Sequence, residues 1–219
     1  MKGTRQHWRH RGTSAALYDM GVQQERVARV LASLLWGSAV GRLYSEVHLL
    51  SHVPEGSLVI DVPCGGGVAF RGLRPDQQLA YVAVDVSRSM LARAARQAAW
   101  RGLSHVRFVE ADVEALPFRE GHFDLCLAYN SLHCFADPGR AVSELVRVLG
   151  PGGVLRGSAV LTGAGRRQDV LITLCRSLGV FGPSGRPDEL RSWLAGAGLN
   201  QIRVQTSGAM AFFQAQKPG

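Results

Sequence analysis

Three aspartates follow apolar segments at regular intervals along the chain. Asp61 follows residues 58–60, Asp85 ends the apolar run that begins at residue 79, and Asp112 lies just after the run 106–109. Each run has the length and composition of a buried strand. Parallel strands present their carboxyl ends at one edge of a sheet, where ligands bind in open α/β folds. We therefore expect the three carboxylates to face one ligand that carries hydroxyl groups and a positive charge.

A glycine-rich turn follows the first aspartate. It reads Val62-Pro63-Cys64-Gly65-Gly66-Gly67, and a short helix is predicted over 68–73. Glycine lets a chain bend sharply and lets a ligand approach backbone amides. The turn lacks the G-x-G-x-x-G spacing of dinucleotide folds, and a strand-end carboxylate would repel a pyrophosphate. A ligand with an ammonium group is favoured over a nicotinamide dinucleotide.

The segment resembles motif I of class I S-adenosylmethionine-dependent methyltransferases, with Pro63 where the first glycine is usual. The likeness runs from residue 57 to 159 and includes the later strand ends. It implies S-adenosyl-L-methionine as cofactor, with Asp61 near its amino group, Asp85 on the ribose and Asp112 with Val113 at the adenine. The implied cofactor-binding set is Asp61, Pro63, Cys64, Gly65, Gly67, Asp85, Val86, Met90, Asp112, Val113 and Asn130.

Candidate groups for the acceptor side follow the fourth predicted strand, 123–130. His133 is the one titratable residue in the exit loop, and its ordinary pKa suits proton removal. Departure of a neutral thioether needs no acid, and a base is needed only where the acceptor must lose a proton. His133 is thus a candidate catalytic base, and Tyr129 and Tyr18 are candidate substrate contacts. Trp36 and Tyr44 could line the pocket, although core packing is the favoured interpretation.

Strands alternate with helices from 58 to 159, which is typical of a parallel sheet covered on both faces. Two amphipathic helices are predicted before this core, over 22–35 and 40–50, and Ser87 is placed as the cap of the helix that contains Met90. A helix is expected over 170–178, another from 187, and a hairpin over 201–216. By the resemblance, these make a doubly wound, mostly parallel seven-stranded Rossmann-like sheet with a terminal antiparallel hairpin and an N-terminal helical cap.

One domain is the natural reading of 219 residues. We divide it into a basic tail (1–14), a helical cap (15–56), a cofactor-binding core (57–160), a lid (161–186), and a last helix and hairpin (187–219). No apolar run reaches the ~20 residues that a membrane helix needs. The four cysteines show no zinc spacing, and no metal is predicted. Reduced thiols and the lack of a signal segment favour a cytoplasmic protein.

The predicted function is methyl transfer from S-adenosyl-L-methionine to a small apolar or aromatic acceptor, with oxygen the expected atom, then carbon or nitrogen. The exit loop of the fourth strand is similar to that of a small-molecule group that includes quinone-biosynthesis methyltransferases. The formal charge of +8 keeps an RNA methyltransferase as an alternative, although neither nucleic-acid loop motif follows the fourth strand. A non-catalytic cofactor-binding partner is a further alternative, and the sequence leaves the oligomeric state open.

Overall fold

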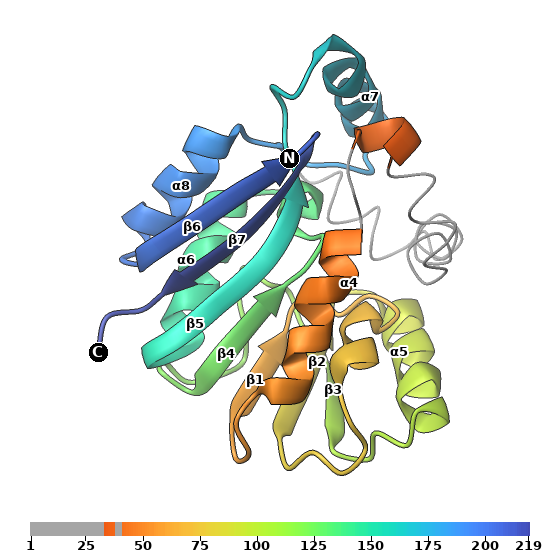
Figure 1. Ribbon diagram of the computed structural model, residues 1–219, viewed down its shortest axis with the longest axis vertical. Coiled ribbons are helices and arrows are strands. Elements are labelled where there is room, and N and C mark those ends of the chain that lie inside the picture. Colours follow the sequence, from red (N-terminus) through yellow and green to blue (C-terminus); the bar gives the residue numbers. More distant parts are fainter. Residues whose placement is uncertain (1–32, 38–40) are drawn as a thin grey trace.

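A single mixed sheet organises the chain in the computed structural model, which describes residues 33–37 and 41–219. The sheet has seven strands in the order β3-β2-β1-β4-β5-β7-β6 (Figure 1). The first five are parallel and β7 pairs antiparallel with both neighbours. This confirms the predicted fold class. The strands are β1 Leu58–Asp61, β2 Ala80–Asp85, β3 Val106–Glu110, β4 Phe123–Ala128, β5 Leu149–Val160, β6 Asn200–Ser207 and β7 Met210–Gln216.

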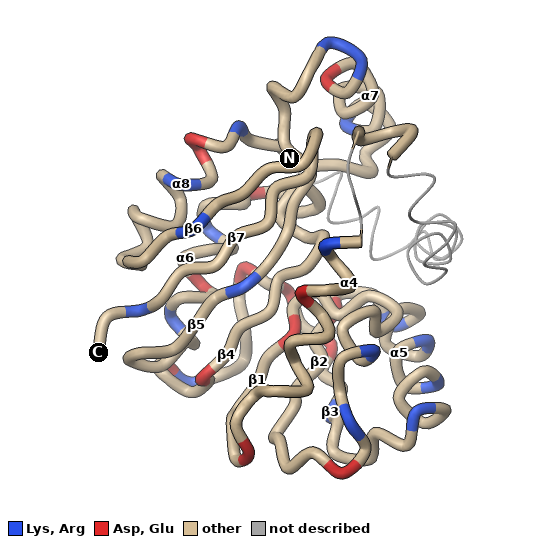
Figure 2. The backbone as a smooth tube through the Cα atoms, viewed as in Figure 1, with Lys and Arg blue, Asp and Glu red and all other residues tan. Residues whose placement is uncertain are grey.

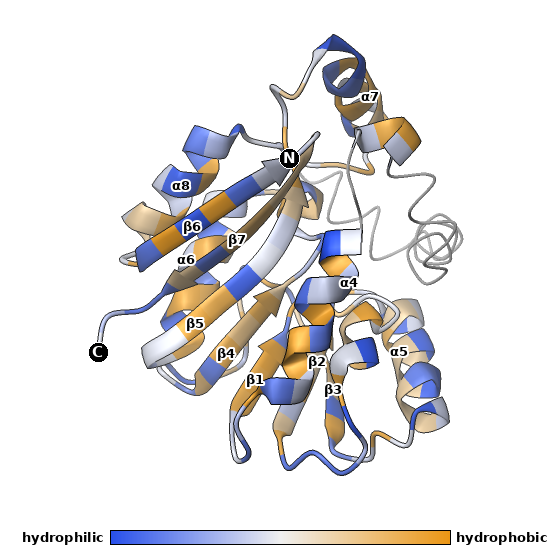
Figure 3. Ribbon diagram, in the orientation of Figure 1, coloured by the Kyte–Doolittle hydropathy of each residue, from blue (hydrophilic) through white to orange (hydrophobic). Residues whose placement is uncertain are grey.

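The central strands are apolar because both of their faces are covered (Figure 3). On one face, α6 (Pro138–Val148) and α8 (Pro187–Gly196) bury Leu145 and Leu190. On the other, α4 (Gly41–His48), η1 (Leu49–His52), η2 (Val68–Gly72) and α5 (Arg88–Trp100) pack over β1, β2 and β3. The two resulting cores are separate layers on either side of the sheet.

Several element limits differ from those predicted. The segment after the glycine turn is a 3-10 helix of five residues, η2. The lid helix α7, Arg166–Ser177, begins four residues before the predicted start, because the turn glycine Gly165 precedes it and its carbonyl accepts from Asp169 N. Ser87 occupies the N-cap position of α5, but its side chain makes no capping bond and instead contacts the Ser89 hydroxyl at 2.9 Å.

The described part of the cap matches the second of the two predicted helices, as α4 followed by η1. Most of the first predicted helix, and Tyr18 with it, lies outside the described residues. Residues 33–36 form a helical turn next to α7 (Figure 1). Tyr44 is buried in the core below α4, and Trp36 stacks on Phe181 with ring centroids 5.8 Å apart. No helix in the described ranges is long and apolar enough to cross a membrane.

Gly72 sets how closely the cap approaches the sheet. A methyl group at this position would collide with the carbonyl of Val47, which is backbone of α4 and cannot yield as a side chain would, and would press on Leu50. The absence of a side chain at Gly72 therefore lets η2 and α4 pack backbone to backbone. Because η2 directly follows the glycine turn, this contact also fixes where the turn lies below the cap.

We expect Gly72→Ala to lower the free energy of unfolding by about 3 kcal/mol, the upper range for forcing an extra group into a packed core. Gly196→Ala is the matched control, because Gly196 lies in α8 with open space around its missing side chain. That control should leave stability unchanged or raise it slightly. Urea unfolding followed by circular dichroism measures both. Equal stability of the two variants would contradict the close packing of η2 on α4.

Candidate functional site

The carboxyl ends of β1, β2, β3 and β4 lie level at one edge of the sheet. Asp61 pairs in register with Ala83 of β2 and Leu127 of β4, and Asp85 pairs with Glu110 of β3. The loops that leave these strands carry most of the residues predicted to bind a cofactor. The sheet therefore brings Asp61, Asp85 and the glycine turn together, as the strand pattern predicted.

The glycine turn is held against the sheet by backbone hydrogen bonds. Val62 N donates to Leu127 O of β4 at 2.9 Å, and Cys64 N donates to Val84 O of β2 at 2.8 Å. Gly65 and Gly67 then adopt left-handed conformations, with φ of 51° and 86°, which favour glycine over other residues. Pro63 follows a cis peptide bond. The backbone of the turn is thus shaped before any ligand binds.

Asp85 joins the turn to the second strand. Its Oδ2 accepts from Gly65 N at 3.0 Å, and its Oδ1 accepts from Ser87 N at 2.8 Å. The side chain is almost fully buried. A carboxylate offers about four acceptor sites, so the same group can hold the loops and also accept from hydroxyls of a ligand. Sequence reasoning gave Asp85 only the second task.

Asp61 lies in the core below α4, where Tyr81 is its partner. The Tyr81 hydroxyl donates to Asp61 Oδ2 at 3.0 Å. Burial raises the pKa of Asp61, the Tyr81 bond lowers it and the charge of Asp85 raises it, and together they bring it to about 7. The carboxyl is therefore only partly ionised near neutral pH. A cation placed beside it would favour the carboxylate.

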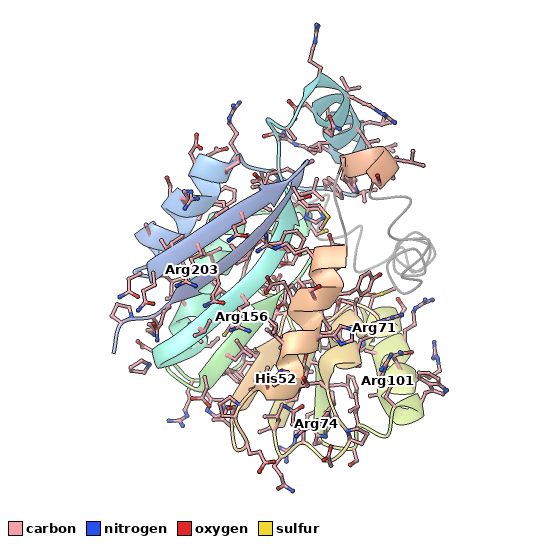
Figure 4. All side chains as sticks on the ribbon, in the orientation of Figure 1. His52, Arg71, Arg74, Arg101, Arg156 and Arg203 are labelled. Carbon is pink, nitrogen blue, oxygen red and sulfur yellow. The ribbon has the colours of Figure 1, made fainter. Side chains whose placement is uncertain are left out.

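Tyr129 follows β4 and places a hydroxyl on the same face of the sheet. The group is buried and has no hydrogen-bond partner among the described residues. Its pKa is raised by burial and by the charges of Glu46 and Asp61, while Arg156 opposes the rise. The phenol is thus a donor at neutral pH. Arg156 Nε on β5, shown in Figure 4, also lacks a partner in the described chain.

His133 lies in the short 3-10 helix η3, Leu132–Cys134, away from solvent. Its Nδ1 accepts from Val160 N at 3.1 Å, its ring meets the Phe181 ring edge-on at 4.4 Å, and its carbonyl accepts from Gly182 N at 2.8 Å. Burial lowers the pKa of His133 to about 3. The ring is neutral at pH 7, and Nδ1 cannot take a proton without losing the bond to β5. These contacts give His133 a positioning role, and its catalytic role stays a prediction.

The remaining predicted cofactor contacts lie in neighbouring loops. Asn130 has φ of 52°, which is uncommon for a residue other than glycine, and its N donates to Ser158 Oγ at 2.9 Å. Asp112 Oδ1 accepts from Glu114 N at 3.0 Å, which shapes the loop after β3. Val113 and Met90 are buried, and Val86 is half-buried. Their contact with a cofactor stays a prediction.

Sequence reasoning missed Tyr81, Ser158 and Phe181. Tyr81 was read only as part of an apolar strand, yet its register opposite Val59 places it on the face of Asp61, one step away diagonally. Ser158 and Phe181 come from β5 and from the segment after α7. Their partners are 28 and 48 residues away in sequence, so no local pattern signals these contacts.

Comparison with known proteins finds matches to one family. Residues 60–156 match the family model of a methyltransferase domain. A demethylmenaquinone methyltransferase of Thermus thermophilus is 50% identical over 74 residues, covering 34% of this chain and 33% of the relative. Phthiotriol/phenolphthiotriol dimycocerosates methyltransferase 1 of Mycobacterium ulcerans is 37% identical over 102 residues, covering 46% and 36%.

A solved structure agrees with these matches at the level of the fold. Phosphoethanolamine N-methyltransferase 2 of Haemonchus contortus, in complex with phosphomonomethylethanolamine and S-adenosylhomocysteine, has a TM-score of 0.70 at 17% identity. The alignment covers 80% of this chain and 53% of that chain. The chain spans about a third of the length of the curated relatives it matches.

The raised pKa of Asp61 predicts a pH-dependent stability. An unfolded aspartate titrates near pH ~4, whereas folded Asp61 titrates at about 7. The folded state holds the proton more tightly, so its free energy of unfolding falls as pH rises through this window and is level above it. Asp61→Asn removes that loss. We expect it to stabilise the protein by a few kcal/mol at pH ~8 and by much less at pH ~4.

Chemical unfolding across this pH range provides the measurement. Asp76→Asn is the control, because the Asp76 side chain is 80% exposed. A stabilisation by Asp61→Asn that does not change with pH would contradict the assigned titration.

Proposed function

Because residues 60–156 match a methyltransferase domain, we propose that the chain is a class I S-adenosylmethionine-dependent methyltransferase that transfers a methyl group to a small apolar or aromatic acceptor. Oxygen is the proposed acceptor atom, followed by carbon or nitrogen. The observation that carries the proposal is the bond between Asp85 and Gly65 N, which sets the glycine turn beside two strand-end acids. The names of the two curated relatives support an acceptor with large apolar parts.

The described residues fit this cofactor in charge and in hydrogen-bonding groups. Asp61 is a buried carboxyl that is only partly ionised at neutral pH, and a positive charge beside it would complete its ionisation, which suits the ammonium group of S-adenosylmethionine. Asp85 would accept from the ribose, and Asp112 with Val113 would meet the adenine. The left-handed turn at Gly65 and Gly67 would let the methionine part approach bare backbone. When bound, the cofactor supplies an electrophilic methyl carbon on a sulfonium.

The chain's own contribution is placement rather than proton transfer. Holding two reactants in line can supply ~7–11 kcal/mol of a barrier. Trp36 and Phe181 form a stacked apolar wall next to His133, which would exclude water and receive an apolar acceptor. His133 holds this wall through its bonds to Val160 and Gly182. The buried hydroxyl of Tyr129 would donate to a polar atom of the bound ligands.

The other functions keep less support. The basic segment on which an RNA substrate would depend, residues 1–14, lies outside the described residues. Truncation of this segment would test its contribution to RNA binding. We propose a small molecule, rather than RNA, as the acceptor. A cytoplasmic location is likewise a proposal. A cofactor-binding partner without catalysis remains the alternative that a turnover assay decides.

Cofactor binding is tested by calorimetry with S-adenosylhomocysteine. We expect micromolar binding by the native chain and roughly a 10- to 100-fold loss in Asp112→Asn and Asp85→Asn, the range for hydrogen bonds to a charged group. Asp76→Asn should bind as the native chain does. Because Asp85 also holds the glycine turn, the thermal unfolding of each ligand-free variant must be compared. Binding of NADH in place of S-adenosylhomocysteine would refute the assignment.

Turnover is tested with S-adenosylmethionine that carries a labelled methyl group. We expect label to pass to phenols, hydroquinones or other apolar hydroxylated acceptors, and not to RNA. At saturating cofactor, the rate should show no histidine titration near pH 6–7, because burial lowers the pKa of His133 to about 3. Tight cofactor binding with no labelled product across the panel would favour the non-catalytic alternative. If label passes to RNA and this transfer is lost when residues 1–14 are removed, the result would favour the RNA methyltransferase alternative.

A further inference from the structure

The lid helix α7 carries an apolar stripe that the described residues leave exposed. Val170, Leu174 and Leu178 are 69%, 53% and 61% exposed. Their spacing of four residues places them on one face of the helix, which continues in helical conformation through Leu178. Ile172 is fully buried, so the opposite side of α7 makes the contact with the core. Three large apolar side chains in one row are a contiguous surface rather than scattered exposed residues.

Two arginines border this stripe. Arg166 and Arg167 lie four and three residues before Val170 and are both exposed, and Figure 2 shows the arginines of α7 in blue. The acid of this helix, Asp169, accepts from Gly163 N at 2.8 Å at the start of the lid. The outer side of α7 thus combines apolar side chains with unbalanced positive charge. A basic amphipathic helix of this kind binds in the headgroup region of a bilayer.

The surface extends beyond α7. Residues 33–36 lie beside the helix in Figure 1, and Figure 3 shows apolar colour on both segments. A side chain at Gly37 would meet Gln168 Nε2 of α7 at 3.3 Å, which confirms that the two segments touch. Leu34 and Leu35 are 56% and 37% exposed. Two neighbouring elements therefore present apolar residues at the carboxyl edge of the sheet, where the proposed site lies.

Charge decides among the possible occupants of this surface. A second copy that bound symmetrically would bring the same arginines face to face, and like charges in an interface are unfavourable. The chain's own N-terminal residues 1–11 are also basic, with Lys2, Arg5, Arg9 and Arg11. An anionic lipid surface offers both negative charge for the arginines and hydrocarbon for the leucines.

We propose that α7 docks the protein on the surface of an anionic bilayer, with Val170, Leu174 and Leu178 inserted between headgroups. This goes beyond the proposed function, and it does not depend on it for its test. The segment after α7 leads through Gly182 to His133 at the sheet edge. Docking would thus bring the lid side of the site toward the lipid, where an apolar acceptor is dissolved.

Vesicle flotation of the full chain tests the docking. One set of vesicles is phosphatidylcholine alone, and the other contains about one-third phosphatidylglycerol. We expect binding to the anionic set. Leu174→Ser with Leu178→Ser should lower the partition coefficient about tenfold or more, through the loss of buried apolar area. Arg166→Gln and Arg167→Gln should each lower it about fivefold.

Matched controls carry the same changes elsewhere. Leu49→Ser alters a leucine that is 47% exposed in η1, at the opposite edge of the sheet. Arg96, Arg107 and Arg203 are exposed arginines on α5, β3 and β6, and Figure 4 labels the last of them. Their replacement by Gln should leave partition close to that of the native chain.

Four outcomes would overturn the proposal. The first is absence of binding to anionic vesicles. The second is an equal fall in the partition coefficient for the α7 variants and their controls, which would mean that binding does not depend on the α7 surface. The third is a dimer in sedimentation that the leucine variant dissociates. The fourth is a large fall in melting temperature for Leu174→Ser, which would mean that the chain itself covers the stripe. S-adenosylhomocysteine binding by the same variants shows that failure of docking is separate from failure of the proposed function.

Discussion

The carboxylate of Asp85 is the group on which the arrangement of the site depends. One oxygen holds Gly65 of the turn after β1, and the other holds Ser87 at the start of α5. Because the group is almost fully buried, both bonds are shielded from competing water and are stronger than at a surface. The glycine turn, the end of β2 and the first turn of α5 are thereby fixed as one unit. Asp85 thus shapes the loops around the proposed ligand and, in our proposal, also contacts that ligand.

Asp61, unlike Asp85, lacks enough hydrogen-bond partners among the described residues to offset its burial, and Tyr81 is the one that donates to its side chain. Burial makes ionised Asp61 unfavourable in the empty protein, and a single hydroxyl offsets only part of that cost. Such a group is retained more readily for binding than for stability, since a packed apolar pair would serve the core equally well. The proposed ammonium ligand supplies the missing charge. The same carboxyl that would raise affinity for the ligand therefore lowers the stability of the protein without it.

Much of the fold could be predicted because its signals are local. Apolar runs that end in an acid identified β1 and β2, and the alternation with helices identified the parallel sheet. Residues joined by long-range contacts could not be predicted in the same way. The Asp61–Tyr81 bond depends on strand register, and the burial of His133 depends on β5 and Phe181 reaching it from other parts of the chain. The histidine was predicted to be a base because it is the one titratable residue in the exit loop of the fourth strand.

The hydrogen bond from Gly182 N to His133 O ties the end of the lid to the loop after β4. Gly163 and Gly179, with φ of 92° and 73°, stand on either side of α7. Val180 N and Phe181 N both donate to Cys175 O of α7, and Ile172 of α7 is buried in the core, so the helix and the segment after it are joined as one piece. A displacement of α7 would therefore pass through Phe181 and Gly182 to the loop that carries His133, which couples the lid mechanically to the acceptor side of the proposed site.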